Sequence, residues 1–175
     1  MLYNLPNIPR FHLCGPFTYE QAKKFEGRFL VYVVFLNERP IKVGETLNNP
    51  WRKNKHSRAK LRNGTPSKQN QRGIKQRLED KDLRLIIGDR RDDVQVYLYH
   101  LLPEDFCDYE RKALGVCQNE EYTCSWLKEK EAYLKRYLME EQGKALLLEE
   151  QWPGILAANR ENAARYREDL SLCLS

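Results

Sequence analysis

An unbroken run of eight apolar residues, Phe29 to Leu36, most constrains how this chain can fold. Such a run without polar alternation predicts a strand that is central in its sheet and covered on both faces. A turn over residues 37–40 follows, and then a second strand-like segment, Ile41 to Thr46. The pattern therefore predicts a β-hairpin over residues 29–44.

The rest of the chain reads as helices, short strands and an irregular start. Residues 1–18 contain three prolines and a glycine, which predicts an irregular arm. Ser125 is a candidate N-cap for the helix that follows it. Helices are predicted over residues 19–26 (closed by Gly27), 50–61, 126–140 and 155–170, with a polar helix or loop over 67–80. Further strands are predicted over 83–87 and 94–102, the latter with Tyr97 and Tyr99 on one face.

These elements indicate an α/β fold. We expect a small mixed β-sheet flanked by helices, with a helical C-terminal part. At 175 residues the chain fits one compact domain with a core of its own. Its expected parts are residues 1–27 (arm and short helix), 28–140 (core, with a basic insertion over about 50–81) and 141–175 (helical extension).

Positive charge is concentrated just after the hairpin. Residues 42–81 hold 12 Lys or Arg against 3 Asp or Glu, a local charge of +9, whereas the whole chain carries +5. A basic block of this kind favours a polyanionic partner such as nucleic acid over a merely solvated surface. The five cysteines are scattered, and no apolar run is long enough to cross a membrane, so we expect a cytoplasmic protein without a membrane partner.

The hairpin and the predicted helix after it bring together residues suited to phosphodiester cleavage. That reaction needs an activated water, stabilisation of the phosphorane-like charge and neutralisation of the leaving oxygen. Tyr32 offers a phenol on a rigid strand, although such a tyrosine alone is more often a core aromatic. Lys42 on the next strand can lie nearly opposite Tyr32 and favour its phenolate, while Gly44 leaves room for close backbone approach. These residues predict a water-activating pair.

Arg52 and His56 are four residues apart, so they share one face of the predicted helix. Arg52 can hold a phosphate bidentately, and His56 can bond another oxygen or relay a proton. Neighbouring cations could take the place of Arg52, and His56 could be a surface residue. The cations concerned are Lys53, Lys55 and Arg58.

The segments Leu30-Val31-Tyr32 and Lys42-Val43-Gly44 resemble the two half-motifs of the GIY-YIG nuclease superfamily. Lysine stands where most members have tyrosine, which is similar to a subset of its type II restriction endonucleases. The spacing Arg-x-x-x-His also resembles those enzymes. The resemblance spans about residues 28–140 and implies a metal-binding glutamate on a late helix.

Glu131 best fits that implied glutamate, because it shares a helix face with the apolar Leu127, Leu134 and Leu138. A carboxylate on an apolar stripe costs free energy unless something, such as a metal ion, compensates it. Glu129 is the alternative.

The resemblance implies a Mg²⁺-dependent endonuclease for double-stranded DNA, in which Mn²⁺ can replace Mg²⁺ and no small-molecule cofactor is needed. Cutting two strands with one site per chain implies a homodimer. The residues expected to contact DNA are Gly44, Lys53, Lys55, Arg58, Arg62, Gln69, Asn70, Gln71 and Arg72. The alternatives are a binding module without catalysis, a nuclease for branched or damaged DNA, and a basic RNA-associated protein.

Overall fold

The computed structural model describes residues 4–48, 73–108, 110–111 and 125–142. They form one four-stranded sheet in the order β1-β4-β2-β3, in which every neighbouring pair is antiparallel. The strands are β1 (His12–Phe17), β2 (Arg28–Leu36), β3 (Arg39–Thr46) and β4 (Val94–Leu101). The prediction of a mixed sheet is therefore wrong, because an apolar pattern specifies which face a strand buries but not its direction.

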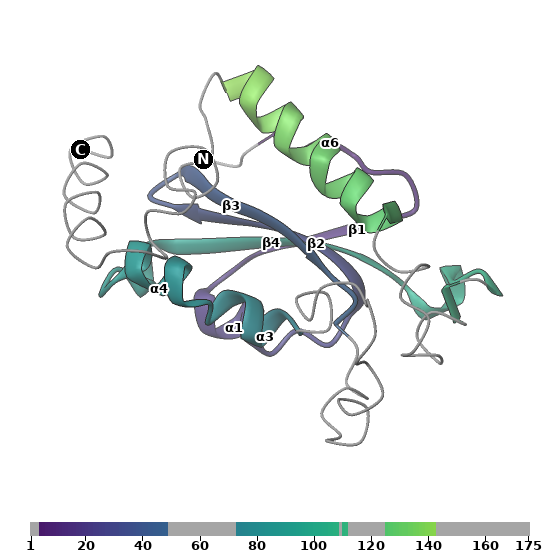
Figure 1. The fold of residues 1–175 in the computed structure, drawn as a ribbon, viewed down its shortest axis with the longest axis horizontal. Coiled ribbons are helices and arrows are strands. Elements are labelled where there is room, and N and C mark those ends of the chain that lie inside the picture. The colour runs from purple at the N-terminus through teal and green to yellow at the C-terminus, as the bar shows by residue number, and fades with distance from the viewer. Residues whose placement is uncertain (1–3, 49–72, 109, 112–124, 143–175) are drawn as a thin grey trace, which may run out of the picture.

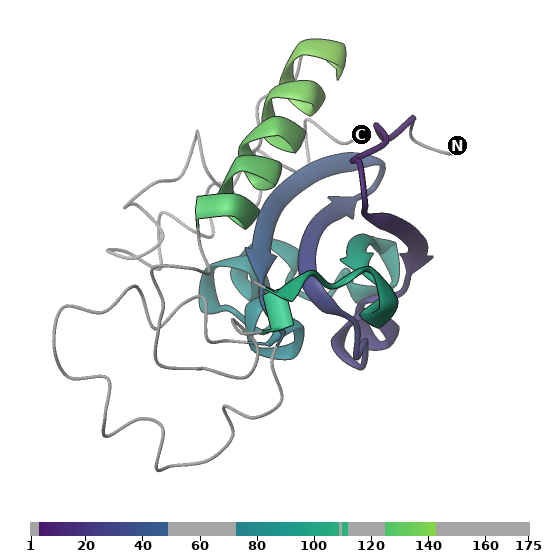
Figure 2. The ribbon, with the colours of Figure 1, turned by 90° about the vertical axis from the view of Figure 1, so that its right-hand side faces the viewer.

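Helices cover both faces of this sheet, so the predicted α/β class is confirmed. The described α-helices are α1 (Tyr19–Lys23), α3 (Ile74–Leu78), α4 (Lys81–Ile87) and α6 (Ser125–Gln142), with short 3-10 turns η2 (Arg91–Asp93) and η3 (Pro103–Asp105). The long α6 lies on one face and the three shorter α-helices lie on the other (Figure 1). Figure 2 shows the same layering after a quarter turn. None of the described helices combines the length and apolar character needed to cross a membrane.

The predicted hairpin is confirmed as β2 and β3, and β2 is the central strand that its apolar run predicts. Its turn is shorter than expected and consists of Asn37 and Glu38, with φ angles of 45° and 64°. Two consecutive positive φ angles are typical of a type I′ turn, whose twist matches that of the strands. The second strand therefore begins at Arg39 rather than Ile41.

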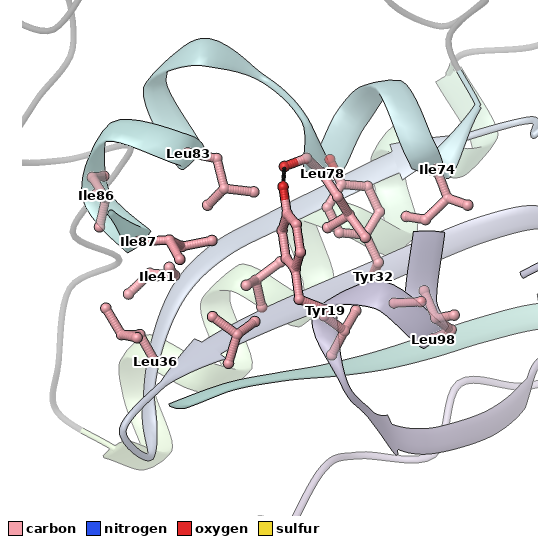
Figure 3. Packing of buried hydrophobic residues seen from close by; sticks show 14 of the residues in the cluster. Tyr19, Tyr32, Leu36, Ile41, Ile74, Leu78, Leu83, Ile86, Ile87 and Leu98 are labelled. Atoms are coloured by element: carbon pink, nitrogen blue, oxygen red, sulfur yellow. Dashed lines mark hydrogen bonds between the residues drawn. The ribbon is translucent and has the colours of Figure 1, made fainter. Parts of the chain in front are cut away.

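Alternate side chains of β2 enter two separate cores. Leu30, Tyr32 and Val34 face α1, α3 and α4 and pack with residues of these helices, as Figure 3 shows for Tyr32, Ile74 and Leu78. We call this cluster the α3-side core. Val31 and Val33 face the other way and pack with apolar residues of α6, in a cluster that we call the α6-side core. The residues of α6 in this core are Leu127, Leu134 and Leu138. Both faces of the sheet are therefore buried, and the sheet separates the two cores.

The segment predicted as a strand over residues 83–87 is instead the helix α4. The Asp80 side chain accepts a hydrogen bond from the backbone N–H of Asp82 and so caps its first turn. Leu83, Ile86 and Ile87 are buried in the α3-side core, with the 3–4 spacing of a helix face. A short apolar run does not by itself distinguish a strand from a helix, and here the cap and the packing decide.

The predicted irregular arm contains the edge strand β1, which pairs with β4 and has a register irregularity between Cys14 and Phe17. An edge strand tolerates the Gly-Pro pair within it because one side of its backbone needs no partner. The residues before it are also fixed, since Tyr99 Oη donates a 2.7 Å hydrogen bond to the carbonyl of Pro6. The first helix ends at Lys23, before the predicted Glu26.

The strand predicted over 94–102 and the helix predicted over 126–140 are confirmed as β4 and α6. Tyr97 and Tyr99 face the α6-side core, opposite Val96 and Leu98. Of the polar segment 67–80, the part that the structure describes contains α3 and the start of the next turn. The helices predicted over 50–61 and 155–170 lie outside the described residues.

Candidate active site

The second half of β3 carries the centre of the candidate site. Its Gly44 is the direct register partner of Tyr32 on β2. A Cβ atom at position 44 would overlap Oη and Cζ of the Tyr32 ring. The glycine is therefore required by the ring that lies over it, a reason internal to the protein. Its predicted contact with DNA stays a prediction.

A β-bulge decides which residues accompany Tyr32. The register shifts between Val34 and Phe35, where β3 contains the extra residue Ile41. Without that residue Lys42 would oppose Val33 and face α6, since a shift of one residue turns every side chain to the other face. With it, Lys42 opposes Val34. Lys42, expected nearly opposite Tyr32, therefore lies diagonally from it on the same face of the hairpin, with Gly44 directly opposite Tyr32.

Tyr32 is only 1% exposed and is packed in the α3-side core. Burial raises the pKa of its phenol well above the ordinary value, and the nearby Arg77 opposes that shift. The phenol is therefore neutral near pH 7. The cation that most favours ionisation of Tyr32 is Arg77 of α3, which no pattern in the sequence marked as a site residue.

Glu45 was not singled out from the sequence, yet it is the most unusual charged residue of the site. It opposes Val31, so its side chain faces α6, and it is 5% exposed. Its Oε2 has no hydrogen-bond partner among the described residues. Burial raises the pKa of the carboxyl to about 7; Arg77 acts against the shift and Glu131 adds to it. An acid between Val43 and Leu47, in alternation with them, was the signal available in the sequence.

Glu131 lies on the buried stripe of α6, as predicted. Its side chain is 17% exposed and forms a 2.6 Å ion pair with Lys135. Its charge adds to the burial that raises the pKa of Tyr32 and of Glu45, although Tyr32 packs on the opposite face of the sheet from α6. The alternative, Glu129, is exposed on the same helix.

The basic segment, residues 49–72, begins just after β3 and ends just before α3. Asn48, just after β3, donates from Nδ2 to the carbonyls of Phe25 (3.0 Å) and Gly27 (2.7 Å), and its Oδ1 accepts from the N–H of Ile74 (3.0 Å). Residues 49–72 therefore leave and rejoin the described structure at one point. They contain eight cations and no Asp or Glu: Arg52, Lys53, Lys55, Arg58, Lys60, Arg62, Lys68 and Arg72.

Several predicted site residues lie outside the described residues. They are Arg52, Lys53, Lys55, His56, Arg58, Arg62, Gln69, Asn70, Gln71 and Arg72. Of the predicted residues that the structure describes, Tyr32, Lys42 and Gly44 share one face of the hairpin, whereas Glu131 lies on α6, which packs against the other face.

The donors available to a metal ion at this site are carboxylates. In the described ranges no group of three or more His, Cys, Asp or Glu side chains is arranged as a complete ligand set. The pair Glu45 and Glu131 offers hard oxygen donors, and one oxygen of Glu45 is buried without a partner. Mg²⁺ takes such ligands, typically one or two carboxylates with water or phosphate completing the shell. The residues present therefore fit Mg²⁺.

Comparisons of the chain with protein-family models, curated proteins and solved structures gave no significant match.

Proposed function

We propose that this chain is a Mg²⁺-dependent endonuclease for double-stranded DNA, with a GIY-YIG-type core most like the small type II restriction enzymes. One observation carries the proposal. The ring of Tyr32 lies over Gly44 of the edge strand β3, and α6, which carries Glu131, packs against that same strand from the other face of the sheet. Tyr32 also packs in one cluster with Ile74, which is hydrogen-bonded to Asn48, so it lies close to both ends of the eight-cation segment of residues 49–72.

In this proposal Tyr32 binds the attacking water and takes its proton. The neutral phenol must first lose its own proton, which burial opposes and positive charge favours. Arg77 and Lys42, on the same side of the sheet, provide part of that charge, and the cations of residues 49–72 add to it. The cleavage rate should therefore rise with pH through neutrality.

The phosphate is held by Arg52 and His56, and Glu131 holds the metal ion. Mg²⁺ supplies Lewis-acid stabilisation of the leaving 3′ oxygen when it is bound. Because each chain has one such site, cutting both strands requires two chains, and we propose a homodimer on DNA. Base contacts are assigned to Gln69, Asn70, Gln71 and Arg72, whose side chains can read base edges.

A DNA-binding module without catalysis is the second candidate. The observation in its favour is the burial of Tyr32, whose ring is packed among Ile74, Leu78 and Leu98. Under this alternative Tyr32 is a core residue, and the basic segment binds DNA without cutting it.

Cleavage of long unmethylated double-stranded DNA distinguishes the two candidates. Wild-type protein, Glu131→Gln and the matched Glu129→Gln variant on the same helix are compared in Mg²⁺ and in EDTA. We expect discrete fragments from the wild type and Glu129→Gln in Mg²⁺, and none from Glu131→Gln or in EDTA. Tight, salt-sensitive binding without cleavage would instead establish the binding module.

A further inference from the structure

Glu45 is a buried acid whose charge is not neutralised by any close partner in the described structure. Its side chain points toward α6 from the edge strand β3, and its Oε2 has no hydrogen-bond partner there. No described cation lies within ion-pair distance of it. A buried carboxylate left in this condition costs free energy that an apolar residue at the same position would avoid.

The surroundings of Glu45 increase this cost. Leu127 and Leu134, on either side of Glu131 on α6, pack in the same cluster as Val43 and Leu47, on either side of Glu45 on β3, which places a second carboxylate on the helix that Glu45 faces. The cations that could offset it are engaged or distant: Lys135 is ion-paired with Glu131 at 2.6 Å, and Lys128 is exposed. Two acids on a strand and a helix that pack together, one of them with a buried unpartnered oxygen, offer the kind of oxygen donors that a divalent cation takes.

We propose that Glu45 is a second protein ligand of the divalent cation held by Glu131, so that one ion joins β3 to α6. The inference rests on the proposed endonuclease function, because it concerns the metal ion of that site. Two carboxylates without a described His or Cys beside them favour Mg²⁺ or Mn²⁺ over Zn²⁺. The cation would also take the place of Lys135 as the counter-charge of Glu131.

Mn²⁺ binding, measured by calorimetry and by the loss of the free-ion EPR signal, tests this without any cleavage assay. The wild type is compared with Glu45→Gln, Glu131→Gln and Glu129→Gln. We expect Glu45→Gln and Glu131→Gln each to weaken Mn²⁺ binding by about tenfold or more, since even outer-shell changes cost that much. Glu129→Gln should bind as the wild type does.

Folding of Glu45→Gln is checked by circular dichroism, and the substitution removes a buried charge without changing the shape of the side chain. A second variant, Glu45→Asp, keeps the charge but shortens its reach. We expect it to bind Mn²⁺ more weakly than the wild type. As a second readout, Mn²⁺ should raise the unfolding temperature of the wild type more than that of either variant.

The outcomes separate this inference from the proposed function. Wild-type affinity in Glu45→Gln, with binding lost in Glu131→Gln, overturns the role of Glu45 and leaves the endonuclease proposal in place. Loss of binding in both variants, without DNA cleavage by the wild type, supports the cation site and overturns the endonuclease. Absence of Mn²⁺ binding by the wild type overturns both.

Discussion

The ring of Tyr32 lies over Gly44, its register partner on β3, in the space that any larger residue would need for its Cβ. This pairing links the two half-motifs of the hairpin by packing as well as by proposed chemistry. The glycine leaves a space over the edge strand β3, and the buried phenol ring of Tyr32 fills it.

Gly44→Ala should displace the Tyr32 ring and destabilise the protein by about 1–3 kcal/mol, the usual cost of overpacking. Urea unfolding measures the change. In a Tyr32→Leu background the same substitution should cost much less, because the ring that it meets is gone. Equal costs in both backgrounds would show that the Tyr32 ring does not set the requirement for glycine.

Tyr32→Phe should abolish DNA cleavage under the proposed function while leaving DNA affinity within about twofold, because only the phenol oxygen is removed. Tyr97→Phe is the control, as Tyr97 is a buried tyrosine of the same sheet that faces the α6-side core. Cleavage rates and electrophoretic mobility shifts provide the two readouts. Full activity of Tyr32→Phe would assign Tyr32 to the core alone.

The stability of the metal-free protein should fall as pH rises from about 4.5 to about 7, through the titration of Glu45. The pKa of this carboxyl is higher in the folded state than its ordinary value of 4.5, so the folded protein binds more protons within that window. Below pH 4.5 the Glu45 carboxyl is protonated in both the folded and the unfolded state, so its burial costs no charge-related free energy. Above pH 7 it is ionised in both states, and the loss of unfolding free energy is complete, on the order of 3 kcal/mol.

Chemical unfolding of wild type and Glu45→Gln in EDTA, at several pH values, isolates this effect from other titrating groups. The unfolding free energy of Glu45→Gln should increase relative to that of the wild type as pH rises from about 4.5 to about 7, and the difference should persist above pH 7. A difference in unfolding free energy that does not vary with pH would contradict the raised pKa of Glu45.

Asn48→Ala should destabilise the protein by about 2–4 kcal/mol, because it removes side-chain hydrogen bonds to Phe25, Gly27 and Ile74. Its φ of 53° is also one that alanine adopts poorly. Asn48→Asp keeps the acceptor for Ile74 but loses both donated bonds, so an intermediate loss is expected in thermal or urea unfolding. Wild-type stability in both variants would show that these bonds do not anchor the ends of the basic segment.

Replacing Lys53, Lys55 and Arg58 by Gln should flatten the salt dependence of DNA binding. Each phosphate contact that is lost lowers the slope of log K against log salt by about 0.9, so the triple variant should lose about 2.7. Fluorescence anisotropy over a salt series gives the slope. Replacing Lys81, Arg84 and Arg90 near α4 by Gln is the charge-matched control, and an equal loss there would indicate a general charge effect.

Local pattern alone determined the elements whose apolar periodicity is long and consistent. The eight-residue run predicted β2 as a central strand, the alternation at Val94 to Leu98 predicted β4, and the stripe of Leu127, Leu134 and Leu138 predicted α6. Among the candidate site residues, the placement of Glu131 on that stripe followed from the same periodicity.

Tertiary structure decided what the pattern leaves open. The run Leu83 to Ile87 is a helix because Asp80 caps it and the sheet buries one of its faces, and β1 exists because β4 supplies the backbone partner that residues 12–17 lack on their own. The bulge at Ile41 placed Lys42 and Gly44 on the face of Tyr32 and turned Glu45 toward α6. A one-residue shift in register is invisible to a pattern of period two, yet it moves every side chain to the other face. That Glu45 faces the helix that carries Glu131 therefore depended on long-range packing, which no local segment of this sequence specifies.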